Sequence, residues 1–270
     1  MNERQVLEGV FSLTETWRLQ GRWQDVQTLL HGLQPVAKAI GVAAQARVWL
    51  KLGLVMSDEG MFAGRDTWEA RQRALQQALT LAKGANEPPL LGDVHDALGM
   101  SIHGHYLAGD RSAEPPDELD HFETGLRLRR QGGTAVQVAE SLFHVGLVYD
   151  VIRRDYDQAA VYHQQAYDMA TEVGEKVIAS YAIRHLGFAH MAAKAYMSAK
   201  DALEESLRLR EEAGFVPGAA FSIIALAHWY MTNDDKTAAL AKLKQAREML
   251  VALGATSRVE WVERHIASLQ

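Results

Sequence analysis

The feature that most constrains this chain of 270 residues is a recurrence of similar residues about every 40 positions. Six glycines stand where one helical pattern ends and before the next begins: Gly41, Gly84, Gly133, Gly174, Gly214 and Gly254. Their spacings are 43, 49, 41, 40 and 40 residues. A glycine just past a helix readily adopts the left-handed conformation that closes the last turn. The spacing therefore predicts six similar helical units in series.

Small residues recur inside these units with the same period. One set is 40 residues apart and a second is 41 and 40 apart: Ala159, Ala199 and Ala239, then Gly146, Gly187 and Ala227. Small side chains mark places where two helices cross closely. Apolar residues over 139–151 and 159–173 mostly follow a helical period, so each unit reads as two helices, and no run favours a strand.

The units over about 134–258 resemble the tetratricopeptide repeat (TPR) family. The residues that carry the resemblance in the best unit are Ala139, Leu142, Val145, Gly146, Tyr149, Tyr156, Ala159, Ala166 and Gly174. The next two units repeat this pattern. A period near 40 is longer than the family's usual 34 residues. It resembles the long-helix variety found in bacterial sensor and regulator arrays and in kinesin light chains.

The resemblance implies an all-α solenoid of about six helix pairs plus a C-terminal capping helix, thirteen helices in all, forming one superhelical domain over 1–270. The repeats would span 3–41, 42–84, 88–133, 134–174, 175–214 and 215–254, with the cap over 256–270. Extra residues over 58–66 and 109–117 separate the helices of the second and third units. Pro115 and Pro116 favour a solvated loop in the second insert.

Composition narrows the class of function. The net charge of −6 argues against a nucleic-acid partner. The absence of cysteine excludes disulfides, thiolate metal sites and cysteine nucleophiles. Without a secretory signal, and with its most apolar stretch (218–227) too short to span a bilayer, the chain is expected to be cytoplasmic with no membrane partner. No phosphate-binding glycine loop or zinc-protease motif occurs, so we expect no enzyme and no cofactor.

In arrays of this kind the first helices of the pairs line a concave binding surface. The register of the small residues places twelve side chains there: Glu140, Phe143, His144, Leu147, Asp150, Tyr181, Arg184, His185, Phe188, Phe221, Ile224 and His228. The same offsets farther N-terminal give Arg47, Lys51, Leu54, Asp93, Asp96, Met100 and His103. Aromatic and arginine anchors dominate binding hot spots. We therefore expect a protein or peptide ligand, with Arg184, Glu140 and Asp150 fixing its orientation.

Other interpretations stay open at this point. A tight superhelix could pack some of these residues into its own core. The family's two-carboxylate clamp is not expected, because Leu147 and Phe188 stand where its asparagines are needed. The array could instead sense a peptide or small molecule, or form a homodimer whose groove holds a neighbour's terminal helix.

Two histidine hypotheses complete the alternatives. A cluster of Glu140, His144 and His185 could bind a metal or act in acid–base catalysis, although hydrogen-bonded histidines explain it more simply. Four histidines could make binding depend on pH: His103, His144, His185 and His228. The basic residues at 127, 129 and 130 are interpreted as helix-end charges that suit the macrodipole.

Overall fold

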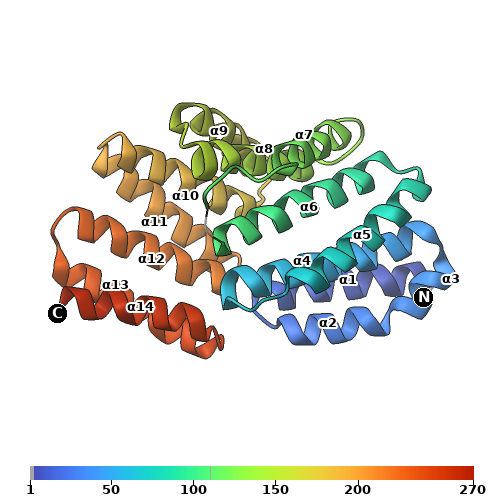
Figure 1. Cartoon of the computed structure of the whole chain (residues 1–270), viewed down its shortest axis with the longest axis horizontal. Coiled ribbons are helices and arrows are strands. Elements are labelled where there is room, and N and C mark those ends of the chain that lie inside the picture. Colours follow the sequence, from blue (N-terminus) through green and yellow to red (C-terminus); the bar gives the residue numbers. More distant parts are fainter. Residues whose placement is uncertain (1–2, 110) are drawn as a thin grey trace. The chain divides into compact units, whose positions relative to one another are not determined.

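The computed structural model describes residues 3–109 and 111–270, and every regular element in those ranges is helical. The all-α prediction is therefore confirmed (Figure 1). The elements are α1 (Glu3–Leu19), α2 (Trp23–Gly32), α3 (Gln34–Ile40), α4 (Val42–Asp58), η1 (Glu59–Ala63), α5 (Trp68–Ala85), α6 (Pro88–Ala108), α7 (Glu118–Arg129), α8 (Ala135–Leu147), η2 (Val148–Arg153), α9 (Tyr156–Glu172), α10 (Lys176–Ala192), α11 (Tyr196–Glu212), α12 (Val216–Thr232), α13 (Lys236–Ala252) and α14 (Thr256–Leu269).

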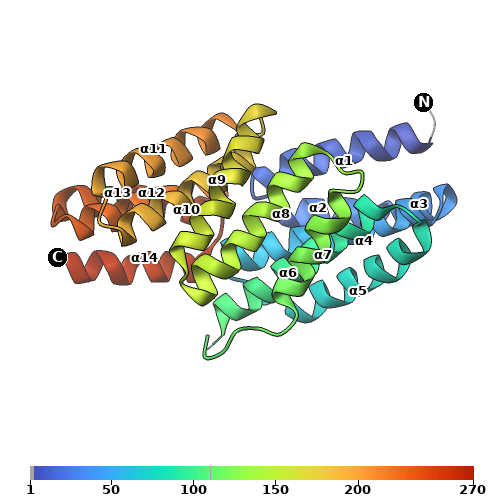
Figure 2. The same cartoon turned by 90° about the horizontal axis from the view of Figure 1, so that it is seen from above.

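The chain divides into two compact units. Unit 1 comprises Met1–Met61 and Arg65–His144, and in it α4 pairs with α5 and α6 with α7. Unit 2 comprises Phe62–Gly64 and Val145–Gln270, and in it α10 pairs with α11, α12 with α13, and α14 packs on α13. Figure 1 shows α10 to α13 in chain order, each in contact with the next, and Figure 2 shows the same helices from above. Helix pairs and the predicted C-terminal cap are both present, while the single superhelical domain over 1–270 stays a prediction.

Glycines allow the paired helices to cross closely, as their spacing predicts. An added Cβ would lie 2.3 Å from the Leu75 side chain at Gly53, 2.5 Å from the Phe122 ring at Gly99 and 3.0 Å from the Leu203 side chain at Gly187. At Gly146 the facing side chain is His163, whose ring would lie 2.6 Å away. In these four repeats the second helix thus presents one large buried side chain, which we call its core residue, to the small residue of the first helix.

The helix ends follow local chemistry. Gly174, Gly214 and Gly254 have φ of 73°, 67° and 66°, the left-handed conformation that closes a helix. Gly84 differs, because α5 continues to Ala85 and Asn86 takes the left-handed conformation instead, with φ of 55°. Aspartate oxygens cap the starts of helices, as Asp235 does by accepting from the Ala238 backbone N–H.

The count of thirteen helices is wrong, because residues 3–109 and 111–270 contain fourteen α-helices. The second helix of the first repeat is broken at Leu33, and a new helix starts with Pro35 in its first turn. Proline lacks the N–H that a continuous helix would need and is tolerated only in a first turn. Two first helices also end in π-helical turns, η1 and η2.

The two inserts behave differently. Residues 111–117 are mostly exposed, which confirms a solvated loop there, while Asp110 lies outside the described residues. In the other insert, Phe62 and Ala63 are buried within unit 2. The Phe62 ring packs edge-on against Phe215 and Phe221, with centroids 5.5 and 5.3 Å apart. This part of the insert therefore belongs to the C-terminal core.

One segment, Ala135–Arg153, is long and apolar enough by composition to cross a membrane. The sequence analysis had named only the shorter stretch 218–227. In the structure 56% of its most apolar window is buried, as in the core helix of a folded domain.

Candidate functional site

Seven of the twelve predicted groove residues lie on two first helices of unit 2, and one of them, His185 on α10, is buried. Tyr181, Arg184 and Phe188 are on α10, and Phe221 and Ile224 are on α12; all five are half-buried. His228, also on α12, is exposed. Half-buried aromatic rings offer apolar area while staying accessible, which is the character of a binding anchor. Their role as a binding surface stays a prediction.

Arg184 is held among aromatic rings and polar groups. Its guanidinium carbon lies 5.2 Å from the centre of the Phe188 ring, and Nη2 is 3.1 Å from Nε2 of His185. Its Nε atom is buried and has no hydrogen-bond partner. Burial lowers the pKa of Arg184, while the side chains of Tyr181 and Asp150 act in the opposite direction.

A second arginine that the sequence analysis missed lies beside Arg184. Arg210 on α11 is 0% exposed, and its Nε and Nη1 donate to Ser180 Oγ at 3.1 Å and to the Gly218 carbonyl at 2.7 Å. The guanidinium lies 4.7 Å from the centre of the Tyr181 ring, and Nη2 has no partner. Burial and the charge of Arg184 lower the pKa of Arg210 to about 9. The protein therefore buries a guanidinium that it does not neutralise.

Arg129 in unit 1 is also buried, but acidic side chains surround it. Its guanidinium nitrogens lie 2.8 Å from Asp93 Oδ1, 3.1 Å from Asp96 Oδ1 and 3.0 Å from Glu140 Oε2. Burial alone would lower the pKa of Arg129, but the three carboxylates outweigh it and raise the pKa. Arg129 does lie in the last turn of α7, as interpreted from the sequence, but it is 4% exposed and paired with acids, which the sequence did not indicate. Only Arg127 and Arg130 of that run are exposed.

The remaining predicted residues are largely internal. Five of the twelve are buried: Phe143, His144, Leu147, Asp150 and His185. His144 hydrogen-bonds to Asp96, and Glu140, which is half-buried, pairs with Arg129. The alternative of packing within the repeat core therefore describes these five side chains.

The histidines have partners other than those expected from the sequence. His185 bonds to Asp150, whereas Glu140 and His144 bond to Arg129 and Asp96. Burial would raise the pKa of Asp150, but the imidazoles of His163 and His185 outweigh it and lower the pKa. Burial also lowers the pKa of His185 to about 3, so this residue cannot supply the expected pH response near neutrality.

A different group of potential metal ligands lies in unit 2. Asp150, His163 and His185 each offer one ligand atom, and these atoms lie within 4.8 Å of one another. Imidazole and carboxylate donors suit zinc and related ions. However, Arg184 already contacts the second ring nitrogen of His185, and its positive charge opposes a cation there. His163, the core residue of its repeat, was not identified from the sequence.

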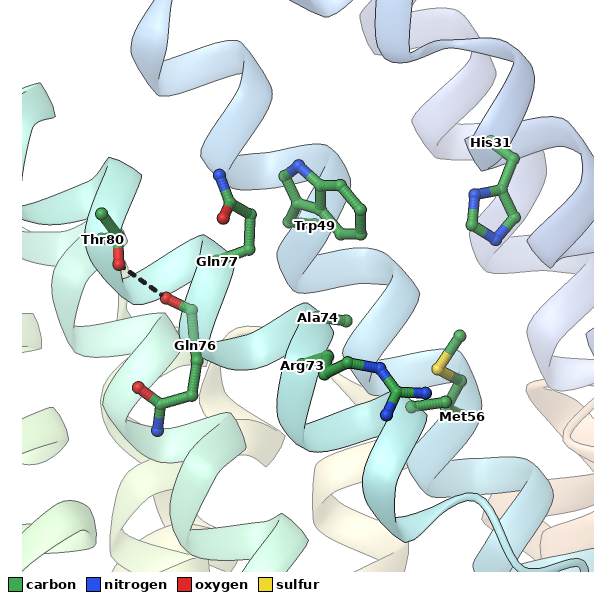
Figure 3. Close-up of a pocket in the computed structure, with 9 residues that line it drawn as sticks. His31, Trp49, Met56, Arg73, Ala74, Gln76, Gln77 and Thr80 are labelled. Carbon is green, nitrogen blue, oxygen red and sulfur yellow. Dashed lines mark hydrogen bonds between the residues drawn. The ribbon is translucent and has the colours of Figure 1, made fainter.

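Unit 1 also holds an open pocket of about 680 Å³ that the sequence did not indicate. Figure 3 shows Trp49 and Met56 projecting into it from α4, His31 from α2, and Arg73 and Gln77 from α5. A pocket that combines apolar and aromatic side chains with a few polar groups is typical of small-molecule sites. None of these residues faces the predicted groove register, so the pocket lies on a different surface of α4.

No protein-family model matches the sequence, and a sequence search of curated proteins gives no match. Solved structures do match in fold. A Rap protein complexed with Competence and Sporulation Factor has a TM-score of 0.64 at 13% identity, covering 100% of this chain and 76% of its own. BtubC (BKLC) from P. vanneervenii has a TM-score of 0.56 at 16% identity, covering 88% and 92%. The assembly chaperone of RpL4 (Acl4) has a TM-score of 0.51 at 16% identity, covering 99% and 100%. At these identities the matches show a shared helical-repeat fold and support the resemblance to TPR proteins.

Proposed function

We propose that the chain is a non-catalytic, cytoplasmic module that binds a protein or peptide through the first helices of unit 2. The observation that carries this proposal is the row of half-buried aromatic and aliphatic side chains on α10 and α12 around Arg184. A Rap protein with a bound factor and an assembly chaperone share the fold, which supports a partner of this class. No cofactor is needed for recognition of this kind.

A pair of variants tests the surface. Replacing Phe188 with Ala removes a half-buried ring that stacks with Arg184, and should weaken partner binding by about 1–3 kcal/mol without unfolding the chain. Met197 on α11 is 67% exposed and provides the control, since Met197→Ala removes apolar area outside the proposed surface. Affinity for a peptide selected from a random library would be measured for both. Equal affinity in wild type and Phe188→Ala would reject the surface.

The second candidate is a small-molecule sensor, which the pocket beside Trp49 favours. Trp49→Ala should then abolish the thermal stabilisation given by hits from a screen of apolar and amide-containing ligands. Hits that stabilise wild type and Trp49→Ala equally would remove the pocket from consideration.

A further inference from the structure

Arg129 and Arg210 occupy equivalent places in their repeats. Arg129 follows the core residue Phe122 by seven positions, and Arg210 follows the core residue Leu203 by seven. Seven residues are two helical turns, so both arginines lie on the same stripe as the core residue. The structure thus offers two versions of one site within a single chain.

The two arginines also make the same backbone contact. Nη1 of Arg129 donates to the Gln137 carbonyl at 3.1 Å, and Nη1 of Arg210 donates to the Gly218 carbonyl at 2.7 Å. Gln137 and Gly218 each stand nine positions before the small residue of the next first helix, Gly146 and Ala227. The two arginines therefore share their register and this backbone contact, whereas Nε of Arg129 donates to Asp93 and Nε of Arg210 donates to Ser180.

Their surroundings differ in charge. The carboxylates around Arg129 come from Asp93, Asp96 and Glu140. The residues at the same register positions around Arg210 are, in the same order, Tyr181, Arg184 and Phe221. An aromatic ring, a second arginine and another aromatic ring have replaced three acids.

The result is a buried positive charge with no acid beside it. Among residues 3–109 and 111–270, no carboxylate forms an ion pair with Arg184 or Arg210, and Asp150, the acid that acts on Arg184, is itself held by His185. Nε of Arg184 and Nη2 of Arg210 are buried without acceptors. A buried ion normally has a partner, because desolvation is costly without one. An anion with two oxygens offers one acceptor to each of these two donors.

We propose that Arg184 and Arg210 form a binding site for a carboxylate supplied by the ligand. The Arg129 site identifies the anion, since carboxylate oxygens fill the equivalent space there. The rings of Tyr181 and Phe215, whose centres lie 4.7 and 5.6 Å from the Arg210 guanidinium, favour a carboxylate on an apolar stem. This inference deepens the proposed function, because it places an acidic group of the partner on the same surface. Arg210 is fully covered in this structure, so binding requires a flanking ring to move.

The test uses the full chain and simple carboxylates. Thermal stability is measured in sodium succinate and in sodium chloride at equal ionic strength. It is measured again with acetyl-Phe-Gly bearing a free carboxylate and with the amide of that peptide. Succinate should raise the melting temperature of the wild type, because a ligand that binds only the folded state stabilises it. Stabilisation by the peptide acid but not by its amide identifies a peptide source, and stabilisation by succinate alone identifies a free acid.

Two variants locate the binding. Arg210→Leu introduces the residue that stands at the equivalent place in the next repeat, Leu250, and should weaken succinate binding more than about tenfold. Arg208→Leu is the matched control on the same helix, because Arg208 is exposed and paired with Glu205 and Glu212, and it should bind succinate normally. Each variant is compared with itself in chloride, which removes differences in basal stability. No stabilisation of the wild type by any carboxylate, or equal stabilisation of Arg210→Leu, would overturn the inference.

The outcome separates this inference from the proposed function. If carboxylates do not bind but Phe188→Ala still loses its selected peptide, only the anion site is wrong. If carboxylates bind through Arg210 but Phe188→Ala keeps full peptide affinity, the proposed binding surface is wrong and the anion site stands.

Discussion

The two equivalent arginines should respond in opposite ways to the same substitution. Arg129→Leu removes the cation from three carboxylates, of which that of Asp96 is 3% exposed. Breaking a buried ion pair by removing one partner typically costs about 3–5 kcal/mol, since the other charges stay buried. The free energy of unfolding should therefore fall by that amount in Arg129→Leu.

Arg210→Leu removes a buried cation that has no acid. Replacing a buried ion pair by apolar side chains is often neutral or stabilising by about 1–4 kcal/mol, and a buried cation without an acid has no such attraction to lose. The change also removes one donor each from Ser180 Oγ and the Gly218 carbonyl, at a cost of up to about 1–3 kcal/mol for an acceptor that is left buried and unsatisfied. These terms nearly cancel, so stability should stay within about 1–2 kcal/mol of the wild type.

Urea unfolding followed by circular dichroism measures both variants. We expect the free energy of unfolding of Arg129→Leu to be lower than that of Arg210→Leu by about 2 kcal/mol or more, and the dependence on urea concentration to be unchanged. Equal losses in the two variants would refute the reasoning, because they would mean that the protein itself neutralises Arg210.

Three smaller predictions concern other parts of the chain. His95 and His121 face each other with their Nδ1 atoms 3.0 Å apart, and burial, followed by His121, lowers the pKa of His95 to about 4. As the pH falls, the unfolded chain binds a proton at this histidine before the folded chain does. The free energy of unfolding should therefore be highest above about pH 6.5 and fall as the pH drops toward 4. The fall should be less steep in His95→Gln, and equal slopes of unfolding free energy against pH would contradict this prediction. His163→Leu, which introduces the residue found at 203, should leave the melting temperature near that of the wild type, and a large drop would show that the imidazole stabilises its repeat. Asp235→Ala removes a helix cap and should cost about 1 kcal/mol in urea unfolding, whereas no change would mean that the cap contributes nothing.

Periodicity made the fold predictable from sequence. Glycines opposite core residues, such as Gly53 opposite Leu75, are needed wherever two helices cross closely, so their spacing reports the repeat directly. The breaks within helices were harder to predict from sequence, because the break at Leu33 and the π-helical turns depend on the packing around them. The burial of Phe62 depends on contacts with residues about 150 positions away, which no local pattern reveals.

The candidate site was predictable only in part. The repeat register identified the half-buried residues of α10 and α12. It did not identify residues whose long side chains reach the site from another helix. Arg210 belongs to a second helix, and its guanidinium reaches Tyr181 on a first helix. Its position seven residues after Leu203 could have identified it, because that spacing places Arg210 on the apolar stripe of its helix. A charged residue on such a stripe either is buried with a partner or destabilises the fold.

Hydrogen–deuterium exchange of the chain with and without its selected peptide tests the central claim most directly. Binding through the first helices of unit 2 predicts new protection in α10 and α12, centred on the turns that contain Arg184 and Phe221. Protection confined to α11 and α13, with α10 and α12 unchanged, would contradict it.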